Sequence, residues 1–232
     1  MMRQSIATTA HTEGLPMSLG VHQRFADAWL ACLAHVARHG VPATDDGVRI
    51  REALNVSLAA RTCDRAELVA AGADEERIDL MERKYGELRP VAPYRISYGA
   101  RFRDYAGVDQ VRHVVERLRA KRETKQATMV FHAPADHELP CLSLLDFKVR
   151  DDAVHASAVY RSQNILGSQP GNAIAIREYQ REVAHLLAAR VGVLTFHILS
   201  AHIYAGDFHE TNLLLDRQEK RRRATGTARR GA

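Results

Sequence analysis

The chain has 232 residues, of which 46% are hydrophobic, and its 33 basic and 28 acidic side chains give a net charge of +5. This length and composition predict one domain with a complete hydrophobic core and exclude a chain that is disordered throughout. Seven basic residues and one acid fall within residues 217–232, so the remainder carries a net charge of −1. The positive charge therefore belongs to a short basic tail, and no specific nucleic-acid partner is expected.

The chain shows neither a membrane-spanning segment nor a targeting signal. No apolar run approaches the roughly 18 residues needed to cross a bilayer, and the N-terminus lacks the apolar segment of a signal peptide. We therefore expect a cytoplasmic protein without membrane contact. Residues 1–20 are predicted to form a flexible arm, 21–216 the folded domain and 217–232 a disordered basic tail.

In the first half of the chain, apolar residues recur mainly at helical spacing. They predict a helix over residues 25–39, which ends at the glycine that follows. Residues 49–58 are expected to pass from a loop into a strand, and residues 65–85 carry a helical pattern. Asp109 is expected to open an amphipathic helix over residues 108–118.

The second half of the chain alternates strand and helix signals. Three segments are predicted to be strands: 127–131, 142–149 and 153–160. A long helix is expected over residues 172–191, with Gly192 as its C-cap, and a further strand over residues 193–204. This order predicts an α+β fold, a single domain with a mixed β-sheet flanked by helices.

The three cysteines fit no disulfide framework and no close metal spacing, so no metal site is predicted. Cys32 lies in a helical apolar pattern typical of a buried thiol, and Cys63 is assigned no role. Cys141 is a candidate nucleophile, because Arg161 would favour its thiolate if neighbouring strands bring the two together. On the residues alone, a buried structural thiol remains the alternative.

Four short motifs occur in order along the chain. They are Tyr98-Gly99, Pro140-Cys141, Arg161-Ser162 through Asn172, and His202-Ile203-Tyr204. With these motifs, the chain from Glu52 to Leu215 resembles the thymidylate synthase family, which includes pyrimidine nucleotide hydroxymethylases. The resemblance implies a thymidylate-synthase-like fold and chemistry at carbon 5 of a pyrimidine nucleoside monophosphate.

The resemblance also implies catalytic roles. Cys141 matches the nucleophile that adds to carbon 6 of the pyrimidine, so that carbon 5 can attack a one-carbon unit from methylenetetrahydrofolate or a related pterin. Tyr98 matches a tyrosine of the proton-handling network near carbon 5. Glu52 matches the general acid/base glutamate.

Five further residues match the family's nucleotide-binding positions. Arg161 matches the arginine that binds the 5′-phosphate and supports the thiolate, and Ser162 matches a serine that contacts the same phosphate. Asn172 matches the asparagine that reads the base edge, which favours uracil over cytosine. His202 and Tyr204 match the pair that hydrogen-bonds the sugar hydroxyl.

The sequence departs from the family pattern at several positions. Lys125 stands where paired arginines reach the partner subunit's phosphate, so the resemblance implies a homodimer with one such cation. Leu142 replaces a histidine, and Asn164 replaces an aspartate. The apolar C-terminal segment that closes over folate is replaced by the basic tail, and a more open site favours hydration of the intermediate.

We therefore expect a transferase, with hydroxymethylation slightly favoured over the methylation of dUMP to dTMP. The alternative is a protein that binds the pyrimidine nucleotide without turnover. This alternative is considered because Lys125, Leu142 and Asn164 differ from the residues of the family pattern.

Overall fold

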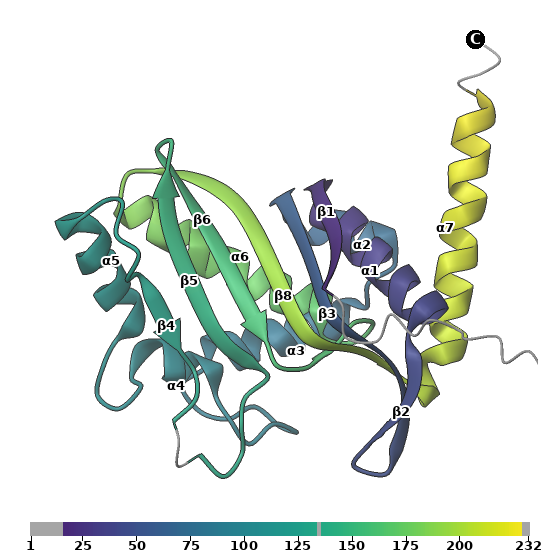
Figure 1. The fold of residues 1–232 in the computed structure, drawn as a ribbon, viewed down its shortest axis with the longest axis horizontal. Coiled ribbons are helices and arrows are strands. Elements are labelled where there is room, and N and C mark those ends of the chain that lie inside the picture. The colour runs from purple at the N-terminus through teal and green to yellow at the C-terminus, as the bar shows by residue number, and fades with distance from the viewer. Residues whose placement is uncertain (1–15, 134–135, 229–232) are drawn as a thin grey trace, which may run out of the picture.

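The computed structural model describes residues 16–133 and 136–228, which form a mixed, twisted sheet with helices packed on one face (Figure 1). The strands of this part of the chain are β1 Met17–Arg24, β2 Val41–Asp45, β3 Val48–Thr62, β4 Thr128–Val130, β5 Leu142–Arg150, β6 Ala153–Tyr160, β7 Gln163–Asn164 and β8 Arg190–Tyr204. They run in the spatial order β1-β3-β8-β6-β5-β4, with β2 beside β3 and β7 beside β8. β1 pairs parallel with β3, and β6 and β7 pair parallel with β8, whereas the remaining pairs are antiparallel.

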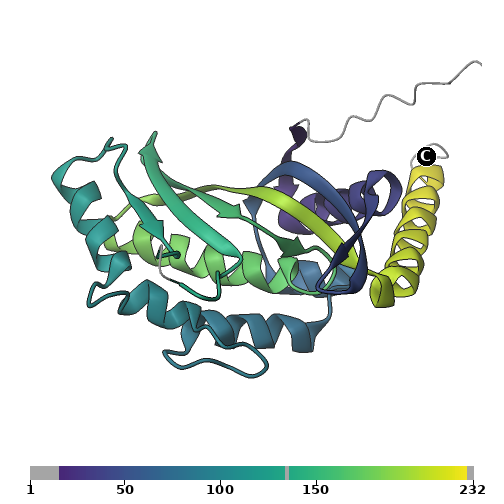
Figure 2. The same ribbon diagram turned by 60° about the horizontal axis from the view of Figure 1, so that its bottom comes forward.

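The helices are α1 Phe25–His39, α2 Arg65–Ala71, α3 Glu75–Gly86, α4 Tyr98–Arg103, α5 Gln110–Ala120, α6 Gln169–Leu186 and α7 Phe208–Ala228, with a short 3₁₀ turn at Ala205–Asp207. α6 and α3 lie behind β5, β6 and β8, whose opposite face carries no helix (Figures 1 and 2). The mixed sheet and the flanking helices confirm the predicted α+β fold. None of the described helices is both long and apolar enough to span a membrane.

Local signals in the sequence account for most helix boundaries. The Asp109 carboxylate accepts the Arg112 amide and caps α5, as predicted. The helical pattern over residues 65–85 forms two helices instead of one. Gly72 ends α2 in the left-handed conformation, at φ 103°, and the Asp74 carboxylate then caps α3.

The prediction for the end of the long helix was wrong. α6 ends at Leu186, and Gly192 lies inside β8 instead of capping a helix. A Cβ atom at Gly192 would lie 2.9 Å from the His155 ring, so the glycine permits close approach of β6.

Both ends of the described chain are more regular than the sequence predicted. β1 begins at Met17, inside the expected arm, and α7 continues through Ala228, inside the expected disordered tail. Gln218 and Arg221 donate to the Ala71 and Ala70 carbonyls at the end of α2, which anchors α7. The predictions for residues 1–15 and 229–232 lie outside the described residues.

The hydrophobic core fills the space between the sheet and the helices. Its largest apolar side chains are fully buried aromatic residues: Phe25, Trp29, Tyr85, Tyr98, Phe102, Phe131, Phe147, Tyr160 and Phe196. The Trp29 indole also donates to the Ile165 carbonyl at 2.7 Å, and the Ile165 amide donates to the His202 carbonyl at 2.9 Å. α1 is therefore tied through one residue to the end of β8.

The Trp29→Phe substitution should lower the free energy of unfolding by about 2 kcal/mol, because the buried Ile165 carbonyl loses its donor and the smaller ring leaves a void. Urea denaturation would measure this change. Leu88→Ala is a suitable control, because Leu88 is 61% exposed and its loss should cost less than about 0.5 kcal/mol. Equal effects from the two variants would contradict the role given to Trp29.

Candidate active site

Cys141 lies just before β5, and Arg161 follows β6, its neighbour in the sheet. The Arg161 amide donates to the Cys141 carbonyl at 2.9 Å. The Arg161 guanidinium donates from Nη2 to the Leu139 carbonyl at 2.7 Å and from Nε to the Pro140 carbonyl at 3.2 Å. Adjacent strands thus bring Arg161 to Cys141, and the arginine braces the segment that carries the thiol.

Three tyrosines lie behind this segment. The Tyr98 hydroxyl accepts the Leu142 amide at 2.9 Å, and its ring stacks on Tyr85 with centroids 4.5 Å apart. The Tyr85 and Tyr160 hydroxyls share a hydrogen bond of 2.7 Å. Burial raises the pKa of all three phenols, so they are neutral near pH 7.

Cys141 is the partly exposed member of the three cysteines. Cys32 and Cys63 are buried, and burial raises the pKa of each of these two thiols to about 12, as expected for inert structural cysteines. A cavity of about 160 Å³ opens beside Cys141. Its wall consists of Lys84, Tyr94, Arg95, Ile96, Tyr98, Glu138, Leu139, Pro140 and Cys141.

A second group of polar side chains follows a row across three neighbouring strands. Glu52 of β3 lies opposite His202 of β8, which lies opposite Asn164 of β7. The Ser200 hydroxyl donates to Glu52 Oε1 at 2.5 Å. Burial lowers the pKa of His202, and its neighbours Asp45 and Glu52 oppose this shift in part. The neutral imidazole then carries one donor and one acceptor.

Tyr204 extends this polar group toward the surface. Its ring lies edge-on to the His202 ring with centroids 5.0 Å apart, and its hydroxyl donates to Asp45 Oδ2 at 3.2 Å. Burial and the Asp45 carboxylate raise the pKa of Tyr204. Asp45 therefore contacts this polar group, although no pattern in the sequence predicts the contact.

The segment from Ser162 to Asn172 connects the thiol region to α6. Ser162 is half-buried next to Arg161, and Asn172 is buried in the first part of α6. Asn164 accepts the Gly167 amide at 2.9 Å, so its side chain stabilises the turn that enters α6. A carboxylate could accept the same amide, so this turn does not account for the asparagine at a position where the family pattern has an aspartate.

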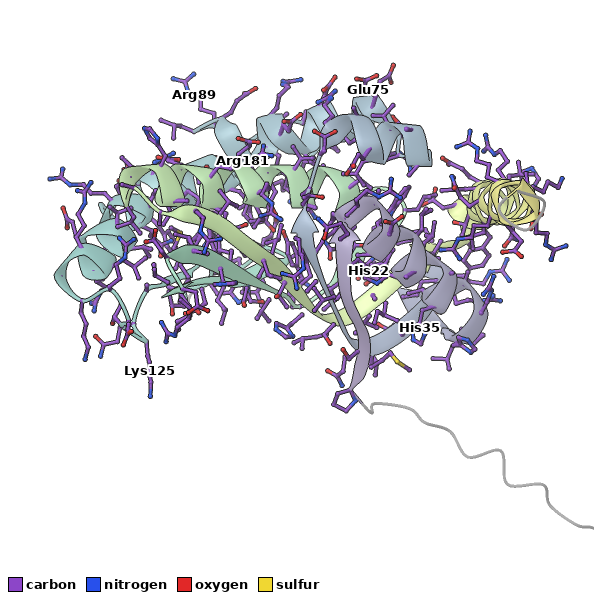
Figure 3. The ribbon with its side chains drawn as sticks, turned by 90° about the horizontal axis from the view of Figure 1, so that it is seen from above. His22, His35, Glu75, Arg89, Lys125 and Arg181 are labelled. Carbon is purple, nitrogen blue, oxygen red and sulfur yellow. The ribbon has the colours of Figure 1, made fainter. Side chains whose placement is uncertain are left out.

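Lys125 is a predicted site residue that lies far from Cys141. It precedes Ala127, whose carbonyl accepts the Phe147 amide at 2.8 Å. Phe147 lies six residues along β5 from Cys141, a separation of about 20 Å at the usual rise of a strand. The Lys125 side chain points away from α3 and α6, on the open side of the sheet (Figure 3).

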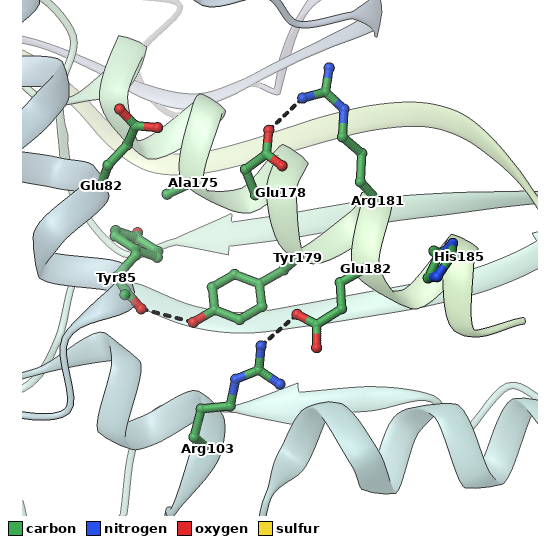
Figure 4. Close-up of a pocket in the computed structure, with 10 residues that line it drawn as sticks. Glu82, Tyr85, Arg103, Ala175, Glu178, Tyr179, Arg181, Glu182 and His185 are labelled. Atoms are coloured by element: carbon green, nitrogen blue, oxygen red, sulfur yellow. Dashed lines mark hydrogen bonds and ion pairs between the residues drawn. The ribbon is translucent and has the colours of Figure 1, made fainter.

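A larger cavity of about 510 Å³ lies on the helical side, between α3, α4 and α6 (Figure 4). Its charged groups are already paired, since Arg103 binds Glu182 and Arg181 binds Glu178. None of the predicted site residues lines it. We therefore place the candidate site at the smaller cavity, beside Cys141.

Sequence reasoning missed Lys84 and Tyr94 in the wall of this cavity. Lys84 belongs to the highly charged segment of residues 65–85, where a lysine is typical of a solvated helix face. Tyr94 follows a proline-rich connection without a periodic pattern. Both residues lie in the wall because α3 packs close to the strand ends, a long-range contact without a local signal.

The fold and the partly exposed thiol can now be compared with known proteins. A family profile described as thymidylate synthase matches residues 45–227. A protein of Methanococcoides burtonii named "Putative thymidylate synthase" is 30% identical over 197 residues, which cover 82% of this chain and 91% of the relative. One of the same name from Methanothermobacter marburgensis is 40% identical over 118 residues, 49% of this chain and 53% of the relative. The thymidylate synthase of Mycoplasma genitalium is 26% identical over 139 residues, 58% of this chain and 46% of the relative.

The chain belongs to the thymidylate synthase family, as the four short motifs predicted. Enzymes of this family are transferases that bind a pyrimidine nucleotide and use methylenetetrahydrofolate.

The Tyr98→Phe substitution should lower the free energy of unfolding by about 1–3 kcal/mol, because the Leu142 amide is left buried without its acceptor. Hydrogen exchange at the Leu142 amide should accelerate in the same variant. Tyr105→Phe is a matched control, since the Tyr105 hydroxyl accepts from Arg101 instead. Unchanged exchange at Leu142 in Tyr98→Phe would show that this hydrogen bond does not hold the segment.

Proposed function

We propose that this protein transfers a one-carbon unit to carbon 5 of a pyrimidine nucleoside monophosphate through a covalent adduct with Cys141. The observation that carries the proposal is the partly exposed Cys141 thiol, held beside a cavity by Arg161 and Tyr98. In the adduct, the Cys141 thiolate forms a bond to carbon 6, and the electron pair displaced from the double bond makes carbon 5 nucleophilic.

Nucleotide binding is assigned to the residues around the thiol. Arg161 and Ser162 hold the 5′-phosphate, for which a guanidinium supplies two parallel donors. Asn172 reads the uracil edge with one amide donor and one acceptor. His202 and Tyr204 bind the sugar hydroxyl from the end of β8.

Proton transfer at carbon 5 is assigned to Glu52 and Tyr98. Glu52 accepts the Ser200 hydroxyl and lies opposite His202, so its carboxylate is held within a polar, partly buried row. A carboxylate fixed in this way can exchange a proton with the base. Tyr98 fixes the Leu142 amide and retains its own hydroxyl proton for donation.

Methylenetetrahydrofolate is the proposed one-carbon donor. The residues beside Cys141 fit the ring portion of such a molecule, because Tyr94, Ile96 and Pro140 give the cavity an aromatic and apolar wall. The cavity of about 160 Å³ accommodates a ring and not a whole donor. The rest of the donor would lie along the surface outside it.

We propose a hydroxymethylated product ahead of a methylated one. Lys84 and Arg95 place two cationic groups in the cavity wall, and the Arg95 side chain is 83% exposed. Water retained by such groups can add to the exocyclic methylene of the pyrimidine before hydride transfer. The relatives' names favour thymidylate synthesis as the second candidate.

The Cys141→Ala substitution should abolish turnover, with a loss of more than about 1,000-fold, because no thiolate remains to form the adduct. The assay incubates wild-type and variant protein with dUMP, UMP, dCMP or CMP and methylenetetrahydrofolate, and identifies products by mass. Dihydrofolate formation would indicate methylation, whereas a product heavier by a hydroxymethyl group would indicate hydroxymethylation. Cys63→Ala is the control thiol variant, expected to remain active.

Exchange of the carbon 5 hydrogen for deuterium separates an enzyme from a binding protein. Tight nucleotide binding by the wild-type protein without exchange or product would support the alternative of binding without turnover. Full activity in Cys141→Ala would contradict the covalent mechanism.

A homodimer is proposed to form through the open face of the sheet. One row across this face runs through paired residues of five strands: Val130, Leu144, Val159, His197 and Ser57. The row carries no acidic or lysine side chain, and the neighbouring Leu199 is 48% exposed. Two such faces can pack against each other as layered sheets. This partner would also explain Lys125, which lies too far from the Cys141 of its own chain.

The Leu199→Asp substitution should convert the dimer into a monomer, because it places a charge in the proposed sheet-to-sheet contact. Light scattering coupled to size-exclusion chromatography would measure the mass. Leu213→Asp is the matched control, since Leu213 is 47% exposed on α7, away from the sheet. A monomeric wild-type protein would contradict the proposed dimer.

A further inference from the structure

Lys84 has an unusual environment for a lysine on a helix surface. It lies in the last turn of α3, half-buried, and its ammonium lies 3.5 Å from the centre of the Tyr94 ring and 4.8 Å from that of Tyr98. Both rings and Lys84 line the cavity beside Cys141. The ammonium is thus held by aromatic faces at the edge of the candidate site.

The nearby carboxylates are committed to other cations. Glu82 binds Arg65, Glu87 binds Arg83, and Glu138, in the same cavity wall, binds Arg95. Burial lowers the pKa of Lys84 to about 8, and negative charge on Cys141 opposes this shift. The ammonium therefore gains stability when an anion forms in the cavity, and in the described part of the chain Cys141 is the group that can supply one there.

We propose that Lys84 is a second cation, besides Arg161, that stabilises the Cys141 thiolate. This assignment rests on the proposed role of Cys141 as nucleophile. The reacting thiol releases its proton to solvent, and its electron pair then forms the bond to carbon 6 of the pyrimidine. Lys84 takes no part in bond formation and acts by electrostatic attraction alone.

Lys84 and Arg161 are proposed to act on the thiolate at different stages of substrate binding. The Arg161 guanidinium already donates to the Leu139 and Pro140 carbonyls, and its charge would be offset by the nucleotide phosphate once substrate binds. Within residues 16–133 and 136–228, the carboxylates near Lys84 are paired with other cations. Support for the thiolate would then come from Lys84 at the moment when the substrate is in place.

The other titratable groups around the cavity do not replace this charge. The Arg95–Glu138 pair is neutral as a unit, and its arginine is 83% exposed. Arg77, which acts on Tyr94, is paired with Asp74 and Asp207. The nearby phenols stay neutral near pH 7, because burial raises the pKa of each: Tyr85, Tyr94, Tyr98, Tyr160 and Tyr204. Lys84 and Arg161 therefore supply the unpaired positive charge facing the thiol.

The effect of Lys84 has a defined pH range. Its ammonium is charged below about pH 8 and loses its proton above it. Stabilisation of the thiolate by Lys84 is therefore greatest near neutral pH and fades as the pH rises.

The test measures alkylation of Cys141 by iodoacetamide as a function of pH, with mass spectrometry to locate the label. In Lys84→Met, the pH midpoint of alkylation should rise by roughly one unit, and the rate at neutral pH should fall by about three- to tenfold. Lys84→Arg should restore most of the rate, because it retains the charge. Lys121→Met is the matched control, since Lys121 is an exposed residue just after α5. In this variant Cys141 should be alkylated at the same rate as in the wild type.

A second measurement does not depend on replacing Lys84. Titration of lysine side chains by NMR should place the Lys84 midpoint lower in Cys141→Ser than in the wild type, because the thiolate that favours the ammonium is gone. An unchanged alkylation midpoint in folded Lys84→Met, or an unchanged Lys84 midpoint in Cys141→Ser, would overturn the proposal. These outcomes are separate from the turnover assay, in which full activity of Cys141→Ala would overturn the proposed function instead.

Discussion

The candidate site depends on the hydrogen bonds from Arg161 to the backbone of residues 139–141. Pairing of β5 with β6 brings the Arg161 amide to the Cys141 carbonyl, and the guanidinium then binds the two carbonyls before it. In all three hydrogen bonds Arg161 is the donor, and the acceptors lie in a segment outside any helix or strand. Because Leu139, Pro140 and Cys141 all line the cavity, the same contacts shape its wall and orient its thiol.

Burial around this segment determines how strongly charges act within the site. The phenols of Tyr85, Tyr98 and Tyr160 form a neutral layer behind Cys141, joined to each other by stacking and by a hydrogen bond. In such an environment, fixed cations interact more strongly with a thiolate than they would in water. The buried tyrosines and the cations Lys84 and Arg161 are therefore parts of one electrostatic arrangement.

The sequence predicted those features that depend on neighbours along the chain. Apolar periodicity placed α1, and the capping aspartate Asp109 placed the start of α5, since both signals are local. The end of α6 was missed because Gly192 is needed for close packing between strands and not for a cap. The helical tail was missed because its anchoring carbonyls, at Ala70 and Ala71, lie far away in sequence.

The same distinction applies to the site. The nearness of Cys141 and Arg161 followed from two successive strands, whereas the contact of Lys84 with Tyr94 and Tyr98 requires the packing of α3 against the loop that follows it. The separation of Lys125 from Cys141 also required the strand register, which places Ala127 beside Phe147.

Ile165 uses both of its backbone groups to connect distant parts of the molecule. Its carbonyl accepts from Trp29 on α1, and its amide donates to His202 at the end of β8. The position of the imidazole thus depends on a helix that contributes no residue to the cavity. A change in α1 that moves Trp29 would consequently shift the end of β8, although the segment at residues 139–141 is held by Arg161 instead.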